Sequence, residues 1–168
     1  VDNEFAALTP VIDFEISDLP VGTLSASVVI PMPPNQFIPE DAVYRKYSDL
    51  LGWVSFVEDS LNTLASAPLN QANECPSVND TSYRSGLNAG DACIKVTIED
   101  GGMYDLDGQI NGVILDPAVI AVENPDYSEV SAIASSATMI VSAGETVVLS
   151  AAGSSDSKNK ALTYNWTQ

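Results

Sequence analysis

The chain has 168 residues, and 23 acidic against six basic side chains give it a formal net charge of −17. So acidic a chain is repelled by phosphate backbones and anionic membranes, and we expect no nucleic-acid partner. Hydrophobic residues make up 45%, enough for a folded core. The sequence has no histidine, the commonest general base, and we expect no catalytic residues. No run reaches the roughly 18 apolar residues of a membrane helix, so no membrane insertion is expected.

Alternation of apolar and polar residues with a period of two predicts strands in the first half of the chain. Segments 11–17 and 24–30 show it clearly, and the turn between them favours an antiparallel pair. Further strands are predicted over 44–47, 52–58 and 93–99. The side chains that we expect in the core are Ile12, Phe14, Ile16, Val28, Ile30, Ile94, Val96 and Ile98.

Two other segments complete the first domain. Residues 59–67 carry Leu61 and Leu64 at helical spacing, which predicts a short helical turn. Two apolar runs, 113–115 and 118–122, are separated by an Asp-Pro pair and are interpreted as short strands. Many short strands between Gly, Pro, Asn and Asp turns predict an all-β antiparallel sandwich over residues 1–123.

A polar, proline-containing stretch follows, and we interpret residues 124–136 as a linker. Strands are predicted after it, over 138–141, 146–149 and 162–167. We expect them to form a second β segment over residues 137–168, which is too short for a complete sandwich of ~80–100 residues. We therefore expect the chain to be a fragment of a longer protein.

The two cysteines, Cys75 and Cys93, flank a polar segment that is rich in turn residues. A usual zinc site needs about four Cys or His ligands, and the spacing is not that of a C-x-x-C redox pair. We expect one disulfide, which would contribute about 3 kcal/mol and would imply an oxidising compartment. The alternative is two free, buried cysteines in a cytosolic protein.

An acidic run from residue 100 to residue 117 reads DGGMYDLDGQINGVILDP. Oxygen ligands at alternate positions suit a calcium ion, which takes roughly 6–8 oxygens. The register is not that of an EF-hand, because Met103 and Ile114 would fall on its first and last ligand positions. The alternative is a turn that contains Asp, Asn and Gly because these residues accept turn geometry. The candidate calcium ligands are Asp100, Asp105, Asp107, Asn111 and Asp116.

Basic and aromatic residues offer two more candidate sites. Lys95, on a polar strand face, could form a surface salt bridge or an isopeptide bond with Asn or Asp. Tyr44, Tyr47 and Trp53 could form an exposed platform on which a sugar or peptide stacks. The alternative for the two tyrosines is an ordinary strand in which both are exposed.

The acidic run resembles the closing signature of the choice-of-anchor U domain, D-G-G-x-x-D-x-D-G-x-x-N-G-V-I-x-D-P. Phe14 and the turn Leu19-Pro20-Val21-Gly22 are similar to that family's opening, so the resemblance spans residues 11–122. The segment between the cysteines is unlike the family's short core. The tail reads VSAGETVVLSAAGSSD over 141–156 and LTYNW over 162–166. It looks like the first half of a polycystic-kidney-disease (PKD) type immunoglobulin-like domain, with Trp166 as the core tryptophan.

Both resemblances imply a secreted or surface protein of bacteria without intrinsic catalysis. We therefore expect a non-catalytic extracellular module that acts as a spacer, an adhesive or a ligand-presenting domain. Its partner would be an extracellular glycan or protein. The alternative is a carbohydrate-binding accessory domain of a secreted hydrolase, because PKD-like domains commonly occur in such enzymes.

Overall fold

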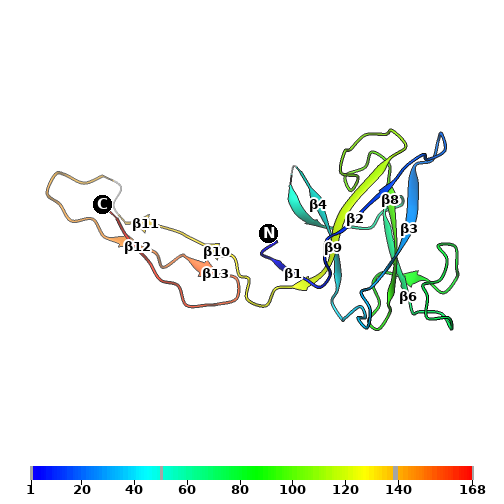
Figure 1. Ribbon diagram of the computed structural model, residues 1–168. Coiled ribbons are helices and arrows are strands. Elements are labelled where there is room, and N and C mark those ends of the chain that lie inside the picture. Colours follow the sequence, from blue (N-terminus) through cyan, green and yellow to red (C-terminus); the bar gives the residue numbers. More distant parts are fainter. Residues whose placement is uncertain (1, 50, 138–139, 168) are drawn as a thin grey trace. The chain divides into compact units, whose positions relative to one another are not determined.

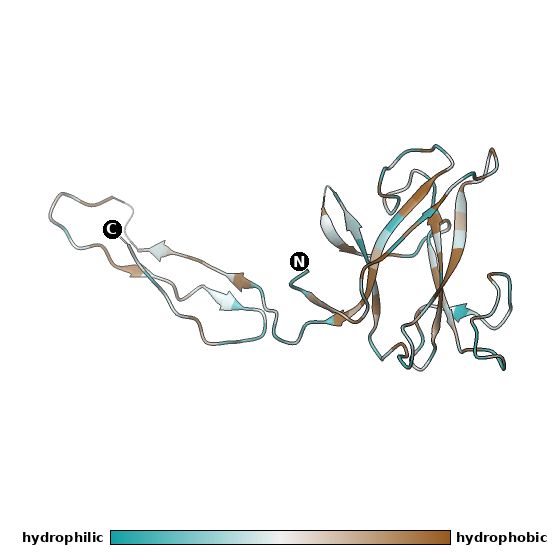
Figure 2. Cartoon of the chain, viewed as in Figure 1, coloured by the Kyte–Doolittle hydropathy of each residue, from teal (hydrophilic) through white to brown (hydrophobic). Residues whose placement is uncertain are grey.

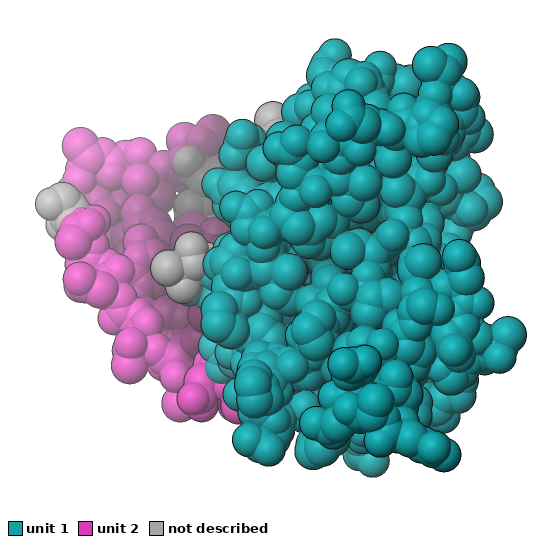
Figure 3. Space-filling model, turned by 45° about the vertical axis from the view of Figure 1, so that its right-hand side comes forward, with its two compact units in different colours: residues 1–124 teal, residues 125–168 magenta. Residues whose placement is uncertain are grey.

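The computed structural model describes residues 2–49, 51–137 and 140–167. The chain divides into two compact units, residues 1–124 and residues 125–168, which Figure 3 colours separately. The described residues contain no helix, and their regular elements are all strands. The all-β fold predicted from the period-two alternation is confirmed.

Five strands form the first sheet of the larger unit, and β9 (Ile114–Glu123) is its central strand (Figure 1). On one edge, β9 pairs with β1 (Phe5–Ala7) and then with β2 (Ile12–Ile16). On its other edge, β9 pairs with β4 (Val43–Ser48), which in turn pairs with β5 (Gly52–Ser55). All of these pairings are antiparallel, so β9 is the strand that aligns the whole sheet.

Four strands form the second sheet, with β8 (Cys93–Glu99) between β3 (Ser25–Pro31) and β6 (Thr63–Ala67). The short strand β7 (Arg84–Ser85) adds to β6. The predicted pairing of segments 11–17 and 24–30 is therefore wrong, because β2 and β3 belong to different sheets. The turn between them is not a hairpin; Leu19 donates its N–H to the carbonyl of Gly112, which directs the chain away from β2.

The two sheets enclose one apolar core, and Figure 2 shows hydrophobic stretches along β8 and β9. Of the predicted core residues, those from β8 and Ile30 are buried. Those from β2, together with Val28, are half-buried and pack against the core. Each fully buried isoleucine contributes about 1.5–3 kcal/mol. The buried residues of the cluster are Ile30, Met32, Ile38, Tyr44, Leu64, Ile94, Val96, Ile98, Tyr104, Ile114, Ala118 and Ile120.

Two expectations about local structure need correction. The predicted helical turn over 59–67 is wrong, because residues from Thr63 onwards form β6. Only the first residues of this segment form a turn. The Asp59 carboxylate accepts the N–H groups of Leu61 and Asn62, at 2.8 and 2.9 Å, and short polar side chains favour such a turn. The two predicted strands around Asp116-Pro117 are one strand, β9. Its ladder with β4 covers residues 118–121, beyond the proline that lacks an N–H.

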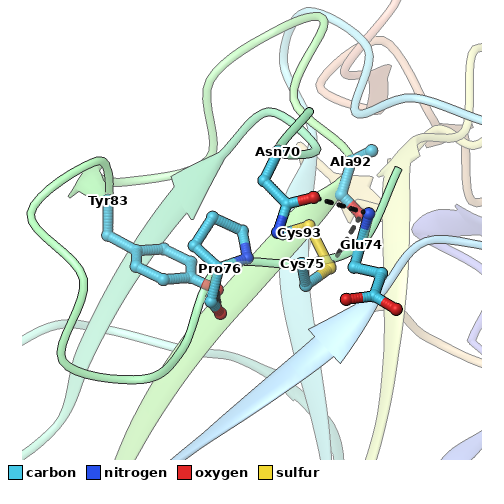
Figure 4. Close-up of a disulfide and its surroundings, with 7 residues drawn as sticks. All are labelled: Asn70, Glu74, Cys75, Pro76, Tyr83, Ala92 and Cys93. Carbon is cyan, nitrogen blue, oxygen red and sulfur yellow. Dashed lines mark hydrogen bonds between the residues drawn. A yellow bond between two sulfur atoms is a disulfide. The ribbon is translucent and has the colours of Figure 1, made fainter. Parts of the chain in front are cut away.

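Cys93, the first residue of β8, is bonded to Cys75 in the loop between β6 and β7 (Figure 4). The predicted disulfide is therefore present, and the two Cα atoms lie 5.5 Å apart. Local hydrogen bonds shape the loop: Asn70 Oδ1 accepts the N–H of Glu74 at 3.0 Å, and Tyr83 Oη donates to the carbonyl of Pro76 at 2.8 Å. The bond thus anchors a polar loop to the central strand of the second sheet.

The described residues of the smaller unit form two short antiparallel pairs. These are β10 (Val130–Ser131) with β13 (Ser155–Asp156), and β11 (Ser135–Ser136) with β12 (Leu149–Ser150). The division after Asn124 lies one residue from the predicted boundary, but the expected linker over 124–136 contains the short strands β10 and β11.

The strands predicted in the tail are mostly absent from the described residues. Residues 138–139 lie outside those residues, Leu149 alone of 146–149 is in a strand, and 162–167 are irregular. Trp166, expected in a core, is 49% exposed. Within the described part of this unit only Asp156 is buried, because so short a segment supplies no second sheet to cover its apolar residues.

We predict that the disulfide contributes about 3 kcal/mol to the free energy of unfolding, because it closes a long loop in the unfolded chain. The double variant Cys75→Ala, Cys93→Ala should lose this amount in urea unfolding followed by circular dichroism. Reduction of the unaltered chain is the matched control, since it opens the bond without creating a cavity at the buried Cys93. An unchanged urea midpoint after reduction would contradict the prediction.

Candidate functional site

Three polar side chains meet inside the core of the larger unit. Tyr44 and Lys46 come from β4 and Asp116 comes from β9. In the β4–β9 ladder, Tyr44 lies opposite Ile120 and Lys46 opposite Ala118, so both face the interior with these buried residues. The exposed fractions of Tyr44, Lys46 and Asp116 are 1%, 1% and 0%. We call these three residues the buried triad.

The carboxylate of Asp116 is the centre of the buried triad. Its Oδ1 is in contact with Lys46 Nζ, and its Oδ2 accepts a hydrogen bond of 2.9 Å from Tyr44 Oη. The ring of Tyr44 belongs to a row of aromatic side chains: it packs edge-on against Phe56, with ring centroids 5.7 Å apart, and the ring centroid of Phe56 lies 4.5 Å from that of Tyr104. The triad is thus a set of fully partnered polar groups in an apolar environment.

Burial changes the acid–base behaviour of all three groups. Loss of water lowers the pKa of Lys46, although the nearby charge of Asp116 acts in the opposite direction. Loss of water also raises the pKa of Asp116, although Lys46 and the hydrogen bond from Tyr44 oppose that shift. Burial, and then the charge of Asp116, raises the pKa of Tyr44 well above its ordinary value. Burial therefore favours an uncharged amine and an uncharged carboxyl group side by side.

Residues 100–113 form a loop, here called the acidic loop, whose carboxylates bind its own backbone. Asp100 accepts the N–H groups of Asn111 at 3.3 Å and Gly112 at 2.9 Å. Asp105 accepts the N–H groups of Gly101 at 2.9 Å and Leu115 at 3.0 Å. Both aspartates are buried, at 6% and 4% exposure, so these bonds link the start of the loop to its end.

The other candidate calcium ligands also have partners within the protein. Asp107 accepts the N–H of Gln109 and the Nδ2 group of Asn111, both at 2.9 Å, while Asn111 Oδ1 accepts the N–H of Val113. Asp116 lies in the buried triad instead of the loop. Among the described residues, no three acidic or cysteine side chains are grouped so that they could hold a metal ion. Calcium stays a prediction, and the contacts present are those of the alternative, a structural turn.

The proposed aromatic platform is wrong for Tyr44, which is buried, and the expectation that both tyrosines are exposed fails for the same residue. Residues three apart in a strand face opposite sides, so Tyr44 points inward and Tyr47 outward. Tyr47 is 38% exposed and lies opposite Trp53 in the β4–β5 ladder, with ring centroids 5.5 Å apart. The structure thus brings together Tyr47 and Trp53 on the outer face of the first sheet.

Trp53 also lines a groove of about 390 Å³ on this outer face. Apolar residues from β1 and β9 line it together with a few polar residues. The sequence did not predict the groove, because the groove exists only where β1 lies beside β9. Of its lining residues, only Trp53 was a candidate binding residue in the sequence. The lining residues are Asp2, Phe5, Ala6, Ala7, Thr9, Val11, Trp53, Val119, Ala121 and Asn124.

Comparison with known proteins gives no match to a family model, to a curated protein or to a solved structure. The resemblances to the choice-of-anchor U and PKD families therefore stay predictions that rest on the residues quoted for them. The part of the chain that the structure describes contains no helix long and apolar enough to cross a membrane.

We predict that the acidic loop tolerates a methyl group at Gly108 far better than at Gly101. Both glycines have positive φ, 61° and 74°, which costs an alanine about 1–2 kcal/mol. A Cβ at Gly101 would lie 2.5 Å from Ile110 Cγ1 and 2.7 Å from Ile110 N, whereas one at Gly108 would meet nothing within 4 Å. Gly101→Ala should therefore lose about 1–3 kcal/mol more in urea unfolding than its control Gly108→Ala. Equal losses would contradict this packing.

We predict that Asp100→Asn lowers the free energy of unfolding by about 1.5–3 kcal/mol. The two backbone N–H groups bind different oxygens of Asp100, and in Asn one of these oxygens is replaced by an NH2 group that cannot accept. The loss should be the same in calcium and in EDTA, since the partners of Asp100 are backbone groups. Thermal melts of the variant and the unaltered chain in both buffers measure this. A loss that is larger in calcium would support the calcium loop instead, because a bound ion stabilises the folded state.

Proposed function

We propose that this chain is a non-catalytic module of a secreted or surface-anchored bacterial protein, in which it acts as a spacer or presents a binding face. The observation that carries the proposal is the disulfide between Cys75 and Cys93, which ties a polar loop to the central strand β8. Disulfides of this structural kind persist in oxidising environments outside the cytosol.

Charge and internal bonding support the same proposal. The net charge of −17 keeps the chain soluble and repels anionic surfaces. Every buried side-chain N and O atom of the described residues has a hydrogen-bond partner, as expected of a rigid β-sandwich. The resemblance of the acidic run to the choice-of-anchor U signature, and of the tail to the PKD family, favours a bacterial surface protein.

An extracellular module has to survive proteases, and this gives a test. We expect the oxidised chain to resist subtilisin roughly tenfold longer or more than the variant Cys75→Ala, Cys93→Ala, because cleavage follows the population of opened chain. The loss of intact chain is measured on reducing gels, so that a cut between Cys75 and Cys93 also separates the fragments, with the reduced and alkylated chain as a control. Equally fast cleavage of the oxidised chain and the variant would remove the main support for an extracellular spacer.

A second function, carbohydrate binding as an accessory domain of a secreted hydrolase, is favoured by the groove beside Trp53. Ligand sites are commonly concave and aromatic with a few polar groups, and this groove combines Trp53 with Thr9 and Asn124. Arg45 does not contribute to it as a free cation. Its guanidinium donates to Asp2 at 2.8 Å and lies 4.2 Å from the ring centroid of Phe5.

The two tryptophans of the chain allow a direct binding experiment. The variant Trp166→Phe leaves Trp53 as the only tryptophan, so its fluorescence reports on the groove. We expect cello-, xylo- or chito-oligosaccharides to change this fluorescence saturably if the groove binds glycans, and Trp53→Ala to lose retention in gels that contain the parent polysaccharide. Tyr164→Ala, which removes an exposed aromatic ring from the other unit, is the control. Unchanged fluorescence with all three glycans would exclude this second function for these glycans.

A further inference from the structure

The buried triad places a primary amine directly against a carboxyl group in the interior of the sandwich. Lys46 Nζ is in contact with Asp116 Oδ1, and neither side chain has significant exposure to water. We propose that Lys46 and Asp116 become joined by an intramolecular isopeptide bond, in which Lys46 Nζ is linked to the side-chain carbonyl carbon of Asp116. This modification goes beyond the proposed function and does not depend on it.

The sheet holds the two reacting groups in place before any bond forms. Lys46 lies opposite Ala118 on β9, and Asp116 is the next residue on the same face of that strand. Such diagonal neighbours are within reach of a long side chain. Because β9 is paired on both edges, by β2 and by β4, neither group can move far from the other. Fixed proximity of this kind lowers the barrier to a reaction between two groups.

The apolar interior also favours the reactive forms. An amine attacks only when it is uncharged, and a carboxyl group releases a hydroxyl group more readily when it is protonated. Burial lowers the pKa of Lys46 and raises that of Asp116, so both changes favour these forms. A buried ion pair is costly to desolvate, whereas an amide carries no charge, so bond formation removes that cost.

The step balances without any further reactant. The free amine of Lys46 adds to Cγ of the protonated Asp116 side chain, and a C–N bond forms. The bond from Cγ to Oδ1 then breaks, and the departing hydroxyl group takes one proton from the nitrogen, so that one water molecule leaves. Tyr44 Oη, which donates to Oδ2 at 2.9 Å, polarises the carbonyl and stabilises the negative charge that develops on that oxygen.

The lysine of this pair is not the one for which the sequence predicted an isopeptide bond. Lys95 was a candidate for an isopeptide bond because it lies on a polar strand face. In the structure Lys95 is half-buried, and its Nζ lies 5.0 Å from the ring centroid of Tyr83 in a cation–π contact. Lys46, which lies between Tyr44 and Tyr47 in the sequence, is the lysine that contacts a buried carboxyl group.

Intact mass spectrometry of the reduced, denatured chain tests the proposal directly. We expect a mass about 18 Da below that of the sequence, because one water has been lost, and the full sequence mass for the variant Lys46→Arg. After trypsin digestion, the peptide 46–84 should be joined to the peptide 96–158, with cleavage after Lys46 blocked. An unaltered chain at its full sequence mass would overturn the proposal without reference to any variant.

Variants separate this bond from other losses of water. Asp116→Asn should lose about 17 Da, as ammonia, if the same amide forms, while Asp116→Ala should show no loss. Circular dichroism confirms that each variant is folded before its mass is interpreted. Loss of water confined to the peptide 96–158, with normal cleavage after Lys46, would indicate a cyclic imide at Asp100-Gly101 or Asp107-Gly108 and would overturn the proposal.

Discussion

The antiparallel ladder of β9 is the constraint on which the larger unit depends. It pairs with β1 and β2 on one edge and with β4 on the other, so three segments from the first third of the chain are aligned by one strand near residue 120. The same ladder places Tyr44 and Lys46 in contact with Asp116 inside the core. The adjoining β4–β5 ladder places the half-buried Trp53 beside Tyr47 on the outer face. Both candidate sites therefore follow from the register of this strand.

Inside this frame, the acidic residues serve mainly as acceptors. Asp100 and Asp105 bind backbone N–H groups of the acidic loop, and Asp91 accepts Ser66 Oγ at 2.7 Å and the exposed Arg84 at 3.0 Å. Asp116 differs from them, because its partners are a buried amine and a buried phenol. Several of the carboxylates thus hold loops in place through hydrogen bonds, whereas burial raises the pKa of the Asp116 carboxyl group.

Much of the local structure could be predicted from the sequence. Period-two alternation identified β2, β3 and β8, because this signal lies in neighbouring residues. The disulfide was predicted because the chain has only two cysteines, no histidine and a polar segment between Cys75 and Cys93. Pairing partners could not be predicted in this way. The turn after Ile16 was compatible with a hairpin, and only competition among all strands for partners placed β2 beside β9 and β3 beside β8.

The sequence by itself determined the all-β class, the acidic surface and the glycine-dependent turns, since composition and short-range periodicity fix these properties. The tertiary structure decided which face of each strand is buried. Alternation around Tyr44 and Lys46 is equally compatible with an exposed or an inward-facing strand. The fold buries both side chains, because the β4–β9 ladder turns them to the interior, where they contact Asp116. A polar group in an apolar interior needs a hydrogen-bond partner, and the partner of Lys46 is Asp116, 70 residues away in the sequence, where no local pattern reveals it.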